Sequence, residues 1–250
     1  MKTFFTRNKL ITLASVVVLL LIWKGVSMVY RSSLLLPSPE DTFITLMTLF
    51  ARHDFFPGLV STIGRGLIGF TLAFITGLWL GIWAGARSSV HAAVKPLLVT
   101  IRSTPVISFI LLALIWFRVD QVPVFIAFLT MFPIFCVNVI DGIRYVDKEM
   151  IEMARIYKVS RRRITREIYI PAIMPYLLSG ASNAMGFGWR AVIIGEVLSQ
   201  PRYGIGTFMQ HSQTYLLVSE LIAWTVIAVL VSYLFEISIR TAEKKLIRWR

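Results

Sequence analysis

Apolar residues gather along this chain into six long runs, which are separated by shorter polar stretches. The runs cover residues 10–30, 58–86, 90–117, 122–140, 172–197 and 218–239. Each is long enough for a helix to cross a hydrocarbon core of about 30 Å. The third contains Pro96, Arg102 and Pro105, and proline inside a spanning helix leaves a backbone carbonyl without its partner. We therefore predict six spans, the third of which is open to division into two helical pieces.

Most of the basic residues lie outside the six runs. They cluster before the first span, after the second, between the fourth and fifth, and after the sixth. In a six-span arrangement these four segments fall on one side of the membrane. Loops rich in lysine and arginine stay in the cytoplasm, so we expect both termini to be cytoplasmic.

The composition supports an all-α integral membrane protein with lipid around it. Hydrophobic residues make up 56% of the 250 positions and charged residues only 16%, and the mean hydropathy is +0.73, far from an average soluble domain. The formal net charge of +13 is accounted for by the cytoplasmic loops. Nucleic acid is therefore not an expected partner. The first run resembles the start of a secretory signal, but it is long enough to span, and we expect it to be retained.

Motifs of enzymes and cofactor sites are missing from the sequence. There is no G-x-x-x-x-G-K-[ST] phosphate loop, no G-x-S-x-G elbow and no H-x-x-x-H pair among three scattered histidines. We expect a protein that is not an enzyme and that binds neither metal nor nucleotide itself. Gly77, Gly81 and Gly85 in the second span have four-residue spacing, which predicts close packing against another helix.

The loop between the fourth and fifth spans is the most informative segment. Residues 148–157 predict a short helix with Ile151 and Ala154 on one apolar stripe. Ser160 is a suitable N-cap for a second helix that ends near Ile168, and Pro171 begins the fifth span. Acidic residues are interleaved with the basic ones around this narrow stripe, which favours docking into a groove of a cytoplasmic protein. The alternative is a loop whose arginines only fix the topology.

The same loop resembles the permease subunits of bacterial ABC importers. Their coupling helices carry the pattern E-A-A, three residues, G, nine residues, I-x-L-P, and the matching positions here are Glu152, Met153, Ala154, Lys158, Ile168, Ile170 and Pro171. Lys158 is the departure that matters, because it replaces glycine, the residue that adopts left-handed backbone at little cost. That difference concerns the turn between the two helices and leaves the docking interpretation in place.

Further segments are similar to the nitrate, sulfonate and taurine branch of these permeases. They are "RSTPVISFILLALIWF" at residues 102–117, "GIRYVDKEMIEMARIY" at 142–157 and "LIRWR" at 246–250. The resemblance covers about residues 58–250 and implies the type I permease fold. On this basis we divide the chain into an N-terminal span with its external loop (1–57), a permease domain (58–240) and a basic cytoplasmic tail (241–250).

The resemblance also implies partners and a mechanism. A cytoplasmic ABC ATPase dimer, which uses ATP and Mg²⁺, would pull on the coupling helices, while an external solute-binding protein delivers a nitrate-like, sulfonate-like, taurine-like or related small organic solute. A second copy of the chain would complete the pathway in the bacterial cytoplasmic (inner) membrane. This chain itself would bind no cofactor.

Two charged residues of the fifth run are candidates for the substrate pathway. Arg190 and Glu196 are six positions apart, so they do not face each other on a straight helix. Ionisable residues in a membrane span mark either a pathway or a pair between helices, and the sequence leaves both open.

Two other classes of transporter remain as alternatives. One is the energising transmembrane subunit of vitamin importers, which work without an external binding protein. The other is an ATP-independent carrier, which would tolerate damage to the cytoplasmic loop.

Overall fold

The computed structural model describes residues 2–30, 32 and 34–246, and this part of the chain is helical, with no strand. Its helices follow one another as α1 (Lys2–Tyr30), α2 (Pro39–Phe50), α3 (Phe55–Ala86), α4 (Ser88–Ser103), α5 (Val106–Trp116), α6 (Val122–Arg144), α7 (Lys148–Ile156), α8 (Arg161–Ile164), a π-helical turn (Thr165–Tyr169), α9 (Ile170–Ser199), α10 (Ile205–Thr214) and α11 (Val218–Leu246). The predicted tail from residue 241 is the end of α11 as far as Leu246, and residues 247–250 lie outside the described part.

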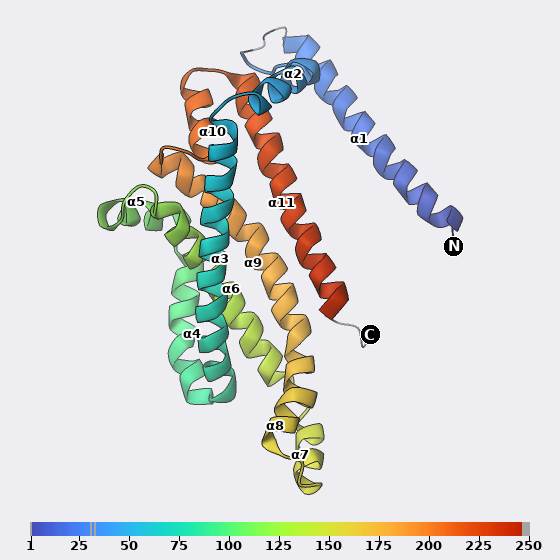
Figure 1. Ribbon diagram of the computed structural model, residues 1–250, viewed down its shortest axis with the longest axis vertical. Helices are drawn as coiled ribbons and strands as arrows, with labels where there is room; N and C mark the ends of the chain where they lie inside the picture. The colour runs from blue at the N-terminus through green and yellow to red at the C-terminus, as the bar shows by residue number, and fades with distance from the viewer. Residues whose placement is uncertain (1, 31, 33, 247–250) are drawn as a thin grey trace.

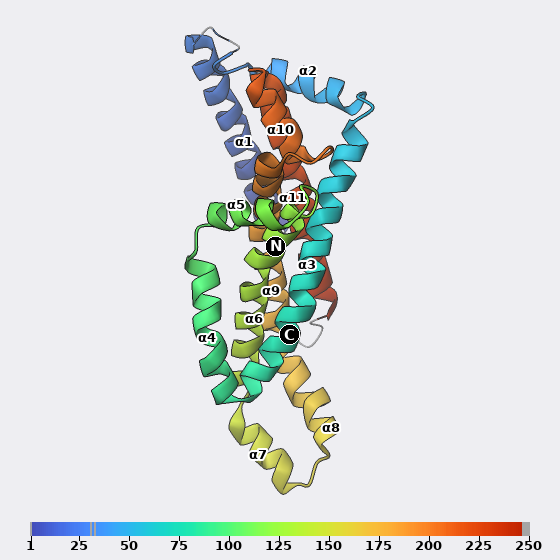
Figure 2. The ribbon, with the colours of Figure 1, turned by 90° about the vertical axis from the view of Figure 1, so that its left-hand side faces the viewer.

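Fewer helices qualify as membrane spans than the six that the sequence predicts. Four are long and apolar enough, at Leu10–Tyr30, Phe55–Ala86, Val122–Arg144 and Val218–Ala242. The interrupted third run is divided, since α4 and α5 meet at an angle of 96° and count as at most one broken span. Figure 2 shows α5 turned across the bundle. The predicted fifth span, α9, has 30 residues but is not among the four, and its sequence includes Ser179, Asn183, Arg190 and Glu196 among the apolar residues.

Helix α6 lies at the centre of the core, with α3 on one side of it and α9 on the other (Figures 1 and 2). The α3 glycines explain how closely α3 approaches. A Cβ atom added at Gly77 would lie 2.7 Å from the Cβ of Phe135, and one at Gly81 would lie 2.7 Å from the Cβ of Val139. Real side chains do not meet so closely, so these positions need glycine. The predicted packing role of the glycine stripe is confirmed.

A second apolar cluster closes one end of the bundle. There Trp224 of α11 stacks on Phe55 and on Phe208 of α10, with ring centroids 5.6 and 5.0 Å away. Helix α1 stands apart and is tied mainly to the segment that follows it, through an ion pair of 2.7 Å between Lys24 and Glu40. At the opposite end of the molecule lie α7 and α8, and the N-terminal end of α1 and the C-terminal end of α11 both point toward that end (Figure 1).

Candidate functional site

Helix α7 forms as the sequence predicts, within one residue of its expected end. Asp147 caps it, because its carboxylate accepts hydrogen bonds of 2.9 and 3.4 Å from the backbone N–H groups of Glu149 and Met150. Ile151 and Ala154 are 9% and 8% exposed. The apolar stripe that the sequence offers for docking therefore faces the protein's own interior, where it positions the helix.

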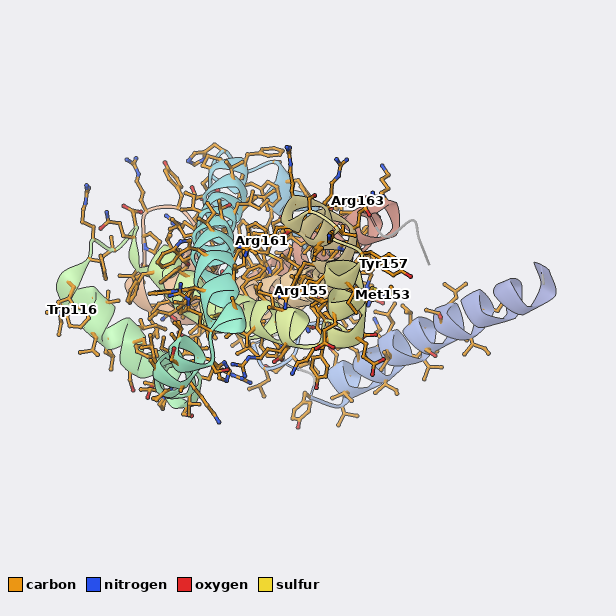
Figure 3. The ribbon with its side chains drawn as sticks, turned by 90° about the horizontal axis from the view of Figure 1, so that it is seen from below. Trp116, Met153, Arg155, Tyr157, Arg161 and Arg163 are labelled. Carbon is orange, nitrogen blue, oxygen red and sulfur yellow. The ribbon has the colours of Figure 1, made fainter. Side chains whose placement is uncertain are left out.

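A different set of apolar residues points away from the protein. Met153, Ile156 and Tyr157, which we call the outward face of α7, are 53%, 78% and 77% exposed. Figure 3 looks onto this end and shows Met153 and Tyr157 gathered with Arg155, Arg161 and Arg163. Glu152 is exposed beside them. A cluster of large apolar side chains at the tip of a loop, ringed by charge, is the usual composition of a binding surface.

The turn between α7 and α8 shows what lysine does at the usual glycine position. Lys158 has a φ of 54°, in the left-handed region that costs a side chain-bearing residue about 1–2 kcal/mol. Its N–H donates to the carbonyl of Arg155 at 2.9 Å, and the N–H of Val159 donates to the carbonyl of Ala154 at 2.9 Å. These two bonds form a Schellman motif. The turn is thus made despite the lysine, and the motif explains why glycine is favoured there.

The second helix of the loop is shorter than predicted. Ser160 precedes α8 as its N-cap, but α8 has only four residues and passes through the π-helical turn directly into α9. Pro171 lies at the start of α9 and has no N–H to donate to a carbonyl in the turn before it. Local π geometry accommodates such a missing bond. Ile168 and Pro171 are half-buried and connect the loop rigidly to α9.

Glu196 lies in a buried network on the other half of the molecule. Its side chain is 0% exposed and pairs with Arg65 of α3 over 2.6 Å. The other carboxylate oxygen accepts hydrogen bonds of 2.9 Å from the hydroxyl of Thr62 and 2.9 Å from the N–H of Gly206. Arg65 also donates to the carbonyl of Tyr203 at 2.7 Å and pairs with Asp120 at 3.0 Å. Every oxygen of Glu196 is therefore satisfied by protein.

Two glycines give this carboxylate its space. A Cβ atom at Gly204 would lie 2.6 Å from Cδ of Glu196, and one at Gly206 would lie 2.7 Å from its Cβ. Gly204 just before α10 and Gly206 in its first turn thus let this segment fit against Glu196. Sequence reasoning missed Arg65, although an arginine inside an apolar span is a signal that demands a partner.

Arg190 lies on a different face of α9 from Glu196, about 120° away around the helix axis. It is exposed, together with Ser179, Asn183 and Phe187. These positions recur at helical spacing, and the polar ones, Ser179, Asn183 and Arg190, form what we call the polar stripe of α9. Arg190 lines a cavity of about 240 Å³ with Asn183 and, from α11, Glu236. The structure thus separates the two charged candidates of the sequence: Arg190 borders open space in this conformation, and Glu196 does not.

Comparison with known proteins identifies the group to which this arrangement belongs. Residues 75–248 match the model of the family "binding-protein-dependent transport system inner membrane component". The chain belongs to this family. It is a permease subunit of a binding-protein-dependent ABC importer for small solutes, and hence a transport subunit rather than an enzyme. The recognition, the fold class and the transport function predicted from the sequence are confirmed.

Relatives and a solved structure support this membership. The chain is 28% identical to the aliphatic sulfonates transport permease SsuC of Bacillus subtilis (strain 168), over 93% of this chain and 85% of that protein. It is 22% identical to the taurine transport permease TauC of Escherichia coli (strain K12), over 98% and 91%. It also resembles the fold of the MetNI methionine ABC transporter in an inward-facing conformation, with a TM-score of 0.64 and 17% identity over 81% of this chain and 96% of that one.

Proposed function

We propose that this chain is coupled to a separate ABC ATPase through the outward face of α7. The observation that carries the proposal is the exposure of three large side chains on this face, Met153, Ile156 and Tyr157, at 53%, 78% and 77%. An apolar ridge on a short helix is suited to a groove in a partner, where large side chains supply most of the binding energy. The ATPase, as a dimer, uses ATP and Mg²⁺. This chain contributes the surface and no cofactor.

The remaining residues of the coupling motif have supporting roles in this proposal. Glu152 lies at the rim of the docking surface, and Ala154 is small because it packs inside the loop. Lys158 closes the turn. Ile168 and Pro171 transmit displacement of the loop into α9, because α8, the π-helical turn and α9 follow one another without a break.

The polar stripe of α9 supports a pathway that is shared with a second copy of the chain. In the part of the chain that the structure describes, no carboxylate forms an ion pair with Arg190. A charged side chain that faces lipid is costly, so residues of this kind face water or another protein chain. We infer that the stripe lines a solvent-filled pathway at the contact between two copies in a homodimer. Glu196, which is enclosed, holds the outer part of α9 in place and does not meet cargo in this conformation.

The substrate in this proposal is a small anion that an external solute-binding protein delivers. Arg190 supplies a permanent positive charge beside the hydrogen-bonding groups of Asn183, while the carboxylate of Glu236 in the same cavity is paired with Arg240. Relatives are described as permeases for aliphatic sulfonates, taurine and bicarbonate, and each of these solutes carries an anionic group. A cavity of about 240 Å³ is on the scale of such solutes.

The orientation of the chain in the membrane follows from the outward face of α7. If α7 meets a cytoplasmic ATPase, the ends of α1 and α11 that point the same way (Figure 1) are cytoplasmic too, in a bacterial inner membrane. We retain the division into residues 1–57, 58–240 and 241–250 as part of the proposal.

Coupling is tested by co-purification and uptake with Ile156→Asp, which places a charge in the proposed docking surface. We expect the ATPase to be lost and uptake to stop, while the protein remains inserted. The matched control is Val119→Asp, a similar change at an exposed apolar residue between α5 and α6, which should retain the ATPase. Normal, ATP-independent uptake by Ile156→Asp would refute the proposal in favour of a carrier.

A further inference from the structure

A second cavity, of about 860 Å³, lies where the cytoplasmic loop meets the bundle. Its walls come from the end of α3, the start of α4, the end of α6, the first turns of α7 and the start of α9. The volume falls within the range of ligand-binding cavities, about 300–1,000 Å³. It is distinct from the Arg190 cavity, which lies between α9 and α11.

The lining of this cavity has two chemical parts. Its interior is apolar, with walls that include Ile143, Val146, Ile151 and Ile173. Two positive charges line it as well, those of Arg144 and Lys148. Both basic residues are exposed, and no carboxylate of the described chain forms an ion pair with either of them; the nearby Asp141 is exposed as well. A cavity with an apolar interior and two cations that form no close ion pair suits a ligand that has an apolar body and an anionic head.

The position of the cavity indicates which ligand of that kind would reach it. In the proposed orientation, on which this inference rests, the apolar helices α3 and α6 end at Ala86 and Arg144 where the hydrocarbon core gives way to lipid headgroups, and the cavity lies beside these ends. Basic pockets between helices on the cytoplasmic side of a membrane are typical binding sites for acidic lipid headgroups.

The docking surface for the ATPase does not compete for this cavity. Helix α7 presents Ile151, which is 9% exposed, to the cavity, whereas Ile156, which is 78% exposed, points outward. The two ends of one short helix therefore face different surroundings. We propose that the cavity binds an anionic phospholipid, with its headgroup at Arg144 and Lys148 and an acyl chain against the isoleucines. The lipid would join α7 to the ends of α3 and α6.

Native mass spectrometry of the full-length protein tests this, with phosphatidylglycerol and phosphatidylcholine of identical acyl chains as probes. We expect the protein to retain phosphatidylglycerol preferentially. Arg144→Gln/Lys148→Gln should weaken that retention roughly 30-fold, at about fivefold for each charge removed near a membrane surface. The matched control is Arg161→Gln/Arg162→Gln, which removes two charges from the same loop but outside the cavity, and it should change retention less than threefold.

Two results would overturn the proposal: no preference for phosphatidylglycerol, or equal losses in the two double variants, which would indicate diffuse attraction by the basic loop. Thr165→Trp provides a test without a change of charge, since Thr165 lines the cavity and tryptophan would fill it. Should Arg144→Gln/Lys148→Gln fail to fold, loss of the lipid in Thr165→Trp supports the site and unchanged retention refutes it. Exclusion of phosphatidylglycerol by the bound ATPase would refute it as well.

Discussion

The α7–α8 loop and the Glu196 network both combine charged residues with a glycine-type turn in the sequence. In the structure, however, the loop is exposed at its tip and the network is buried. In the loop, Ile156 and Tyr157 are left 78% and 77% exposed. In the network, Glu196 is 0% exposed and its oxygens are fully hydrogen-bonded. Groups that the chain satisfies by itself support its architecture, and groups that it leaves open are available to partners. Substitutions in the two regions should therefore affect different measurements.

The largest effect on stability is expected from Glu196→Ala. Removal of one partner from a buried ion pair costs about 3–5 kcal/mol where the other charge is left uncompensated. Here Arg65 would keep its exposed ionic partner Asp120, so we expect a loss toward the lower end of that range. Thermal unfolding in detergent measures the loss. Arg190→Ala, on the exposed face of the same helix, is the control and should change the melting temperature little while it reduces uptake. Equal melting temperatures for Glu196→Ala and the wild type would remove the distinction between the two faces of α9.

Gly206→Ala tests how tightly the network is closed. The new methyl group would meet the backbone oxygen of Ile193 first and would lie 2.7 Å from Cβ of Glu196, and such overpacking typically costs about 1–3 kcal/mol. Gly186→Ala, on α9 with no atom within 4 Å of the added Cβ, should be neutral or slightly stabilising, because alanine favours helix. If both variants melt alike, the first turn of α10 does not fit against Glu196 as described.

A smaller effect on stability is expected in the α7–α8 loop, where Lys158 has left-handed backbone. Lys158→Gly removes the penalty of a left-handed side chain-bearing residue and should stabilise the α7 terminus by about 1 kcal/mol, with ATPase binding retained. Lys158→Ala keeps the penalty while it removes the charge, so it should gain nothing. Hydrogen exchange of the α7 amides reports the local stability. Faster exchange in Lys158→Gly than in the wild type would contradict the Schellman geometry.

The smallest effect is expected at the end of the bundle opposite α7, where Arg52 pairs with Asp54 at 2.8 Å and with Glu220 at 2.7 Å. The hydrogen bond from Arg52 holds the pKa of Asp54 below its usual value. Such a carboxyl adds stability above its unfolded-state pKa and loses it as the pH falls through the lower, folded-state pKa. The wild type should thus lose its melting-temperature advantage over Asp54→Asn below roughly pH 4. An advantage that is constant with pH would show that the Asp54 charge contributes nothing.

The sequence was a good guide to the helices and a poorer one to their faces. Residues 148–157 predict α7 well, because capping and periodicity are local properties. The docking face was assigned to Ile151 and Ala154, and the structure buries both. Periodicity identifies an apolar stripe, but it does not say whether that stripe meets the same chain or a partner. The exposed apolar set became visible only once the loop was folded against the bundle.

The sequence was also a poor guide to pairs of residues that lie far apart along the chain. Arg65 and Glu196 are 131 positions apart, and no local pattern joins them. An arginine in the second run and a glutamate in the fifth nevertheless have opposite charges, and each is costly in a membrane span without a partner. That cost indicates that the two could pair. Run length also does not report the 96° bend between α4 and α5 or the polar residues within α9, so fewer helices pass a test of length and hydropathy than the six apolar runs of the sequence.

Selective labelling of introduced cysteines tests the central claim most directly. The native Cys136 is buried at 0% exposure, so it should contribute little labelling of its own. A membrane-impermeant maleimide should react rapidly with Ile156→Cys and slowly with Ile151→Cys in the isolated chain. Addition of the ATPase should protect only Ile156→Cys. Equal reactivity of the two variants, or an Ile156→Cys that the ATPase leaves unprotected, would contradict the assignment of the outward face of α7 as the coupling surface.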